Sequence, residues 1–252
     1  MTTSHILQYT THDQVAIITM NRPDKRNAVN LEMRQALFAA WEEFENDSAL
    51  RVAILTGAGD RSFCAGRDLS ENNGVSQKVF LPILGDNVSV TKPVIAAVNG
   101  SALGGGWFFT QMCDLVVAAD HAVFGMPESK VGRAPAWAAW LHGVIPQKMI
   151  MELLLTGDPI SAQRAKEIGF VNHVVPAGEL MDKAMQLAQA VVATAPLSAA
   201  ACKATVYAAA EMGRAAALQT AFHIMEPLYD SEDAKEGMRA FQEKRTPKWT
   251  GR

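Results

Sequence analysis

Hydrophobic and polar residues along the first half of the chain predict strands and helices in turn. Residues 15–20, 52–56, 93–98 and 115–118 are apolar runs rich in valine and isoleucine, as expected for buried strands. Between the first two runs, residues 31–44 carry apolar side chains at helical spacing among charged ones. Strands that alternate with helices predict a layered α/β core.

The second half of the chain predicts mainly helices. A short apolar run at residues 122–124 predicts a hairpin partner for the strand before it, and the pattern becomes almost wholly helical after about residue 138. The expected helices cover residues 147–156, 161–168, 179–193, 197–212 and 214–228. We therefore expect a core at residues 1–195 and a helical C-terminal region at residues 196–252, whose apolar helices would pack against a neighbouring subunit.

The composition excludes several classes of protein. The formal net charge is −3, and no basic run is longer than Lys244-Arg245, so the chain lacks the electrostatic footprint of a nucleic-acid binder. The three cysteines have no CxxC spacing and the six histidines no metal-ligand spacing, which predicts reduced thiols, no metal and a cytoplasmic protein. No signal-peptide pattern and no apolar run of membrane-spanning length is present in the sequence.

Three segments carry residues suited to chemistry: SFCAGRDL at 62–69, NGSALGGG at 99–106 and FGMPESKVG at 124–132. Glycines between a strand and a helix present backbone N–H groups to an anion or oxyanion, although a tight turn needed only for packing would use the same glycines. The fingerprints GxGxxG, GxxxxGK[ST] and GxSxG are absent. Their absence disfavours a dinucleotide oxidoreductase, a P-loop enzyme and a serine hydrolase.

These segments stand in order with NRPDKRNAVN, CDLVVAAD and LLLTGDPISAQRAKEIGFVNHVV, and together they resemble the enoyl-CoA hydratase/isomerase (crotonase) superfamily from about residue 5 to the C-terminus. The resemblance implies an α/β fold, a crotonase-like spiral of ββα units with a C-terminal helical trimerisation region. It implies a homotrimer or a dimer of trimers that acts on an acyl-CoA thioester. Coenzyme A would be part of the substrate, with no separate cofactor and neither nucleic acid nor membrane as partner.

The resemblance also implies catalytic roles. The backbone N–H groups of Arg67 and Gly105 would hold the thioester carbonyl and stabilise an enolate, and Glu128 would be the acid and base. The family's other glutamate usually lies three residues beyond the middle glycine, where this chain has Phe108. An aspartate that some relatives carry eight residues beyond the second glutamate is Ala136 here. The apolar neighbours of Glu128 are expected to raise its pKa.

The resemblance implies a larger set of substrate-binding residues. They are Lys25, Arg26, Ala28, Ala65, Arg67, Asp68, Leu69, Leu103, Gly104, Gly105, Phe108, Pro127, Glu128, Val131 and Trp137. The guanidinium of Arg67 is expected at a CoA phosphate or in solvent, and Lys244 is expected to reach a CoA phosphate of its own or a neighbouring subunit. The weakly patterned residues 70–91 predict a loop or lid that decides the depth of the acyl pocket. Four aromatic residues either wall that pocket or fill the core: Trp107, Phe108, Trp137 and Trp140.

A single glutamate leaves the reaction open between two outcomes. The chain would hydrate the double bond of an enoyl-CoA, or it would move the bond between the 3 and 2 positions by carrying a proton from one carbon to another. A hydratase–lyase acting on aryl-propenoyl-CoA is an alternative, because such relatives also lack the first glutamate. A catalytically lapsed CoA-binding or interaction protein is the other alternative, which Phe108 and Ala136 would suit and an intact Glu128 opposes.

Overall fold

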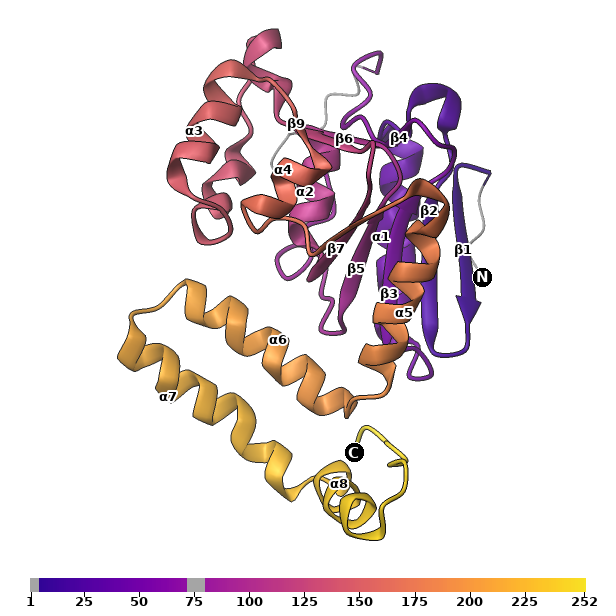
Figure 1. The fold of residues 1–252 in the computed structure, drawn as a ribbon, viewed down its shortest axis with the longest axis vertical. Helices are drawn as coiled ribbons and strands as arrows, with labels where there is room; N and C mark the ends of the chain where they lie inside the picture. The colour runs from indigo at the N-terminus through magenta and orange to yellow at the C-terminus, as the bar shows by residue number, and fades with distance from the viewer. Residues whose placement is uncertain (1–4, 72–79) are drawn as a thin grey trace.

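The computed structural model describes residues 5–71 and 80–252 (Figure 1). The expected loop or lid at residues 70–91 therefore lies partly outside the described residues. Residues 80–91 form a loop with a tight turn, in which Leu84 and Val88 are joined by an isolated bridge. This part of the prediction is confirmed as a loop.

A six-stranded sheet forms the centre of the described structure. Its strands, in spatial order, are β1 (Leu7–His12), β2 (Val15–Met20), β3 (Val52–Gly57), β5 (Val94–Val98), β7 (Leu115–Ala119) and β10 (His173–Val175). Only β1 and β2 pair antiparallel, and the other neighbours pair parallel. Parallel strands require crossover connections, so the order agrees with the predicted alternation of strands and helices.

The central strands are apolar along their whole length because both faces of the sheet are covered. In β3, the side chains of Val52 and Ile54 pack in one cluster with Ala184 of α5 (Leu180–Val192). The alternate side chains Ala53 and Leu55 belong to the larger cluster on the other face. That cluster includes residues of α1 (Leu31–Asn46) and α2 (Gly105–Met112). A strand buried on both faces shows a continuous hydrophobic run, which is the pattern that the sequence displays.

A second, four-stranded sheet carries the motif segments. Its strands, in spatial order, are β4 (Ser62–Cys64), β6 (Ser101–Leu103), β8 (Val123–Gly125) and β9 (Ile160–Ser161). The predicted hairpin between residues 115–118 and 122–124 is wrong, because β8 pairs with β6 and β9 instead of with β7. Both edges of β7 are occupied by β5 and β10, so the chain after β7 crosses to the other sheet.

Helices surround the two sheets and extend below them. Besides those already given, they are α3 (Gln147–Thr156), α4 (Ala162–Glu167), α6 (Pro196–Ala210), α7 (Arg214–Met225) and α8 (Glu232–Glu243). Shorter 3₁₀ helices are η1 (Pro23–Lys25), η3 (Pro127–Val131), η4 (Ala136–Gly143), η5 (Ala177–Glu179) and η6 (Glu226–Asp230). Figure 1 shows α6 and α7 as an antiparallel pair that projects from the sheets, with α8 beyond them.

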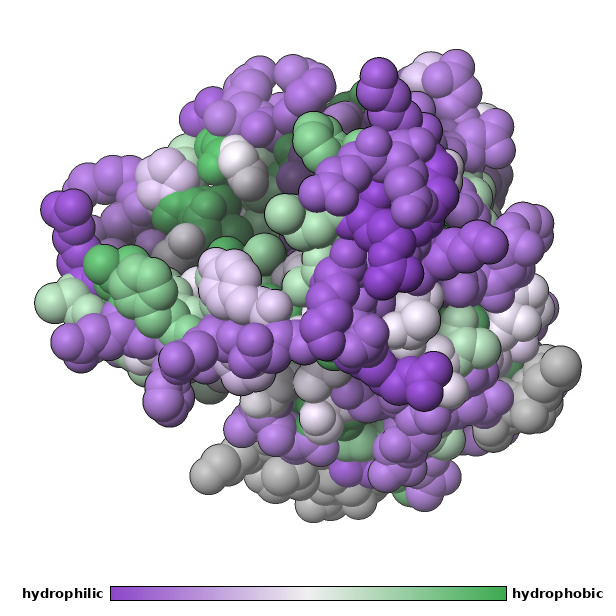
Figure 2. Space-filling view, turned by 90° about the horizontal axis from the view of Figure 1, so that it is seen from below, coloured by the Kyte–Doolittle hydropathy of each residue, from purple (hydrophilic) through white to green (hydrophobic). Residues whose placement is uncertain are grey.

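The C-terminal helices bury little of their apolar surface within one chain. Only Ala201 is buried in α6, and α7 has no buried residue. Large apolar side chains exposed on this region are Val206, Tyr207, Met212, Leu218, Phe222, Tyr229, Met238 and Phe241. Figure 2 views the molecule from this side and shows hydrophobic residues gathered in a hollow of a largely hydrophilic surface. Subunit assembly through these helices stays a prediction.

Within residues 5–71 and 80–252, no single helix is both long and apolar enough to cross a membrane. Residues 177–192 and 196–210 reach the required length and composition only as a pair, and that pair is bent by 107°.

Candidate active site

A cavity of about 440 Å³ opens beside the N-terminus of α2. Its wall is formed by Ala65, Gly66, Arg67, Leu69, Phe80, Leu81, Ile83, Asp86, Gly104, Gly105, Phe108, Pro127, Glu128, Lys130, Val131, Arg133, Ala136, Trp137 and Trp140. Segments far apart in the sequence thus meet in one place: the end of β4, the start of α2, η3 and η4. A cavity with converging polar groups is where a small-molecule site is expected.

Most of the residues predicted to bind substrate line this cavity. They are Ala65, Arg67, Leu69, Gly104, Gly105, Phe108, Pro127, Glu128, Val131 and Trp137. Those that do not line it are Lys25, Arg26, Ala28, Asp68 and Leu103. The chain around Arg26 nevertheless lies beside the site, because the N–H of Ala65 donates to the Arg26 carbonyl at 3.0 Å. A substrate role for any of these residues stays a prediction.

The first predicted oxyanion donor lies on an extended segment beside α2. Arg67 forms an isolated parallel bridge with Val29, in which Val29 N donates to the Gly66 carbonyl at 2.8 Å and Asp68 N donates to the Val29 carbonyl at 2.9 Å. Successive N–H groups of an extended segment point to opposite edges, so the N–H of Arg67 faces away from Val29. It faces the side on which Gly105 lies, and a Cβ built on Gly105 would be 3.7 Å from Arg67 N.

The second predicted donor is the N–H of Gly105, the first residue of α2. The first N–H groups of a helix have no partner within the helix and carry the positive end of its dipole. A Cβ on Gly66 would be 3.0 Å from Gly105 N, so the two backbone segments are in direct contact. Two N–H groups on facing segments are suited to hold one carbonyl oxygen as negative charge develops on it.

Glycine is required where α2 begins. Gly104 has φ 54° and ψ −117°, a backbone conformation that L side chains rarely adopt. At Gly106, a Cβ would lie only 2.0 Å from the carbonyl oxygen of Cys64. The absence of side chains therefore lets the first turn of α2 press against β4, which brings the two donor segments together.

Glu128 lies in η3 with its carboxyl group against these glycines. A Cβ on Gly104 would be 3.1 Å from Glu128 Oε1. Glu128 Oε2 is buried and has no hydrogen-bond partner among the described residues. Burial raises the pKa of Glu128 above its ordinary value. A carboxyl group whose pKa is raised by burial is suited to accept and return a proton near neutral pH.

Aromatic rings form one wall of the cavity. Phe108, which is only 1% exposed, stacks on Trp137 with ring centroids 5.1 Å apart. Trp140 lies 6.1 Å from Phe108 and is 53% exposed. Trp107 instead packs in the core against Phe170 at 4.4 Å. Trp107 therefore fills the core, and the other three rings line the cavity. That they wall an acyl pocket stays a prediction.

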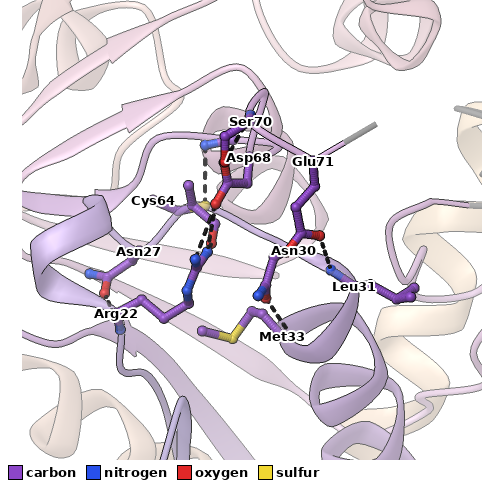
Figure 3. A network of polar contacts seen from close by, with 11 residues as sticks. Arg22, Asn27, Asn30, Leu31, Met33, Cys64, Asp68, Ser70 and Glu71 are labelled. Carbon is purple, nitrogen blue, oxygen red and sulfur yellow. Dashed lines mark hydrogen bonds and ion pairs between the residues drawn. The ribbon is translucent and has the colours of Figure 1, made fainter. Parts of the chain in front are cut away.

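A polar network outside the cavity holds the extended segment in place (Figure 3). Both terminal nitrogens of Arg22 donate to Asp68 Oδ2 at 3.1 Å, and Ser70 Oγ donates to Asp68 Oδ1 at 2.6 Å. These bonds lower the pKa of Asp68, the hydrogen bond from Ser70 being the largest cause. The buried amide of Asn27 donates to the Ser62 carbonyl at 2.8 Å. Asp68 and Asn27 thus hold backbone beside the cavity through hydrogen bonds.

Sequence reasoning missed part of the cavity wall. The sequence predicted that the loop at residues 70–91 borders the pocket, but no periodic pattern singled out the residues that line it, which are Phe80, Leu81, Ile83 and Asp86. The guanidinium of Arg67 stacks over the Phe80 ring at 4.3 Å, a partner that the sequence did not suggest.

The residues described hold no group of three or more His, Cys, Asp or Glu side chains placed to bind a metal ion. The buried thiol of Cys64 accepts a hydrogen bond from Gly66 N at 3.4 Å. Burial raises the pKa of this thiol to about 12, so it is protonated at neutral pH and poorly suited to be a nucleophile.

Comparison with known proteins gives matches over almost the whole chain. A family model described as enoyl-CoA hydratase/isomerase matches residues 10–252. Enoyl-CoA hydratase EchA19 of Mycobacterium tuberculosis is 39% identical over 94% of this chain and 93% of its own. (E)-benzylidenesuccinyl-CoA hydratase of Thauera aromatica is 36% identical over 95% and 96%. The crystal structure of enoyl-CoA hydratase EchA1 from Mycobacterium marinum superposes with a TM-score of 0.92 at 38% identity, covering 99% of this chain and 100% of that one.

Proposed function

Because the chain belongs to the enoyl-CoA hydratase/isomerase family, we propose that it hydrates or isomerises the double bond of an enoyl-CoA thioester through an enolate. The family acts on acyl-CoA thioesters, and relatives of this chain are named as hydratases of such compounds. One observation supports the proposal above all others. The carboxyl group of Glu128, with its raised pKa, lies against the glycine turn that presents the Gly105 N–H.

The thioester carbonyl oxygen lies between the N–H groups of Arg67 and Gly105 in this proposal. Removal of a proton from C2, or addition of a nucleophile at C3, moves negative charge onto that oxygen. Two preorganised donors stabilise the charge, and loss of one such donor typically costs about 10²–10³ in rate.

In isomerisation, Glu128 removes a proton from C2 of a 3-enoyl thioester. The electron pair of the C–H bond is delocalised into the carbonyl and the C3–C4 double bond. Glu128 then returns the proton to C4, which leaves a double bond between C2 and C3. One carboxylate suffices, because it starts and ends ionised.

In hydration, the same carboxylate accepts a proton from water as the water oxygen bonds to C3 of a 2-enoyl thioester. The C2–C3 electron pair moves onto the thioester as an enolate. Glu128 then gives its proton to C2, so that H and OH have been added and the carboxylate is restored. Phe108 supplies no second acid or base, so one group would perform both transfers.

A hydratase–lyase acting on an aryl-propenoyl-CoA is the second candidate. The wall of Phe108, Trp137 and Trp140 favours it, because aromatic rings stack on flat aryl groups. The name of the Thauera relative, a benzylidenesuccinyl-CoA hydratase, points to the same kind of acyl group.

The experiment is incubation of the purified protein and of Glu128→Gln with 2-enoyl-, 3-enoyl- and aryl-2-enoyl-CoAs, followed by mass-resolved chromatography. A product heavier by one water indicates hydration, and a product of unchanged mass with a new retention time indicates isomerisation. A shortened acyl-CoA with an aldehyde indicates the lyase. We expect Glu128→Gln to lose at least about 10² in turnover. Full turnover by this variant would refute the mechanism, and no product from any substrate would favour a catalytically lapsed CoA-binding protein.

A further inference from the structure

The loop at residues 80–88 brings a second acidic residue, Asp86, which is exposed, into the wall of the cavity. Hydrogen bonds within residues 83–88 hold the turn that carries Asp86. Asn87 Oδ1 accepts a hydrogen bond from Ile83 N at 2.7 Å, and Gly85 N donates to the Val88 carbonyl at 2.8 Å. Asp86 N donates to the Ile83 carbonyl at 3.0 Å. The turn is thus held by its own hydrogen bonds, and Asp86 is exposed on it.

The Asp86 carboxylate has no role within the part of the chain that the structure describes. It forms no ion pair or hydrogen bond with residues 5–71 or 80–252. Of the three basic residues on the cavity wall, Lys130 pairs with Asp158, Arg67 stacks on Phe80, and Arg133 forms no ion pair with the described residues. An acceptor that the fold does not use is available to a ligand.

Asp86 lies toward the far end of the cavity from the oxyanion donors. The loop runs along α2: a Cβ on Gly105, at the start of α2, would be 3.0 Å from Leu81, while Leu84 N donates to the sulfur of Met112 at the end of α2. These two contacts are about 10 Å apart along the helix, at 1.5 Å rise per residue. Asp86 follows Leu84 by two residues, whereas Glu128 lies at the opposite, N-terminal end.

The aromatic wall lies between these ends. Phe108 is near the middle of α2, and Trp137 and Trp140 are three residues apart on the 3₁₀ helix η4. Residues three apart on a 3₁₀ helix point in the same direction, so both rings face the Phe108 side. Along the cavity, the backbone donors and Glu128 therefore come first, the aromatic wall follows, and Asp86 lies at the far end.

From this order we propose that Asp86 is a specificity-determining residue that accepts a hydrogen bond from a hydroxyl group at the far end of an aryl acyl chain. The thioester lies at Gly105, the aryl ring stacks on the aromatic wall, and a para-hydroxyl donates to Asp86. This inference rests on the proposed function only in that the cavity binds an acyl-CoA. It assigns no proton transfer to Asp86.

The test is binding of two saturated, unreactive thioesters, 3-(4-hydroxyphenyl)propionyl-CoA and 3-phenylpropionyl-CoA, measured by calorimetry. We expect the hydroxylated compound to bind the unmodified protein about tenfold more tightly, the size of a hydrogen bond to a charged group that also competes with water. Asp86→Ala should abolish this ratio, and Asp86→Asn, which keeps a neutral acceptor, should retain part of it. Asp182→Asn, a change at an exposed aspartate in α5, is the matched control and should keep the full ratio.

The outcomes separate this inference from the proposed function. Equal affinity of the unmodified protein for the two compounds, or a ratio that persists in Asp86→Ala, overturns the role of Asp86. Unchanged affinity of Asp86→Ala for 3-phenylpropionyl-CoA shows that the cavity of the variant is intact. Since neither compound can be hydrated or isomerised, the result is independent of turnover and of the Glu128→Gln experiment.

Discussion

The contact between Gly106 and β4 offers a direct test of how the fold sets the spacing of the two oxyanion donors. A Cβ on Gly106 would lie 2.0 Å from the carbonyl oxygen of Cys64 and 2.8 Å from its carbonyl carbon. Side-chain Cβ atoms essentially never approach within 3.0 Å, so Gly106→Ala must separate α2 from β4 by about 1 Å. The Cys64 carbonyl is part of the backbone, and an added Cβ at position 106 is bonded directly to it. Neither group can therefore relieve the contact by rotation of a side chain.

This displacement should affect activity more than stability. Gly105 and Arg67 lie on the two segments that move apart, and a misplacement of about 1 Å can cost 10²-fold in rate. Overpacking typically costs about 1–3 kcal/mol in free energy of unfolding, of which the better helix propensity of alanine offsets up to about 1 kcal/mol. For a chain of this size, each kcal/mol lowers Tm by about 2–4 °C. We therefore expect kcat/KM to fall about 100-fold with a loss in Tm of a few degrees.

The assay pairs steady-state kinetics on the best enoyl-CoA substrate with urea unfolding followed by tryptophan fluorescence. Gly178→Ala is the matched control, since a Cβ there meets no atom within 4 Å and its φ is not positive. Its stability should change by no more than about 0.5 kcal/mol, with kcat/KM unchanged. If Gly106→Ala matched Gly178→Ala in kcat/KM, close contact between α2 and β4 would not be what positions the donors.

Two further predictions follow from the site. Because burial raises the pKa of Glu128, its ionised form lowers the stability of the folded protein as pH rises through that raised pKa. Glu128→Gln should therefore unfold at higher urea concentration than the unmodified protein at neutral pH. This gain in stability should disappear below pH 4.5, the ordinary carboxyl pKa. If it persisted there, the raised pKa of Glu128 would not be its cause. Phe108→Ala removes a 1% exposed ring stacked on Trp137 and should cost about 3–5 kcal/mol in free energy of unfolding. A urea-derived loss below about 1 kcal/mol would show that the ring is not part of the packed wall.

The sequence by itself determined the fold class and the order of the chemical groups. Continuous apolar runs at 52–56 and 93–98 predicted buried strands, and the structure has them as β3 and β5, covered on both faces in a largely parallel sheet. Glycine and glutamate are recognisable in sequence, because Gly104 needs a conformation that other residues avoid and Glu128 stands in an apolar setting. Both features depend on a residue and its neighbours in sequence, so they can be recognised without the tertiary structure.

Only the tertiary structure decided which residues share the cavity. Trp107 and Phe108 are adjacent in sequence, yet consecutive helical residues point about 100° apart, so one fills the core and the other faces the site. β8 pairs with β6 because both edges of β7 are occupied, by β5 and β10. Asp86 reaches the cavity because a loop without periodic pattern is held along α2 by long-range contacts. Such contacts are set by packing between distant segments, which no local pattern in the sequence encodes.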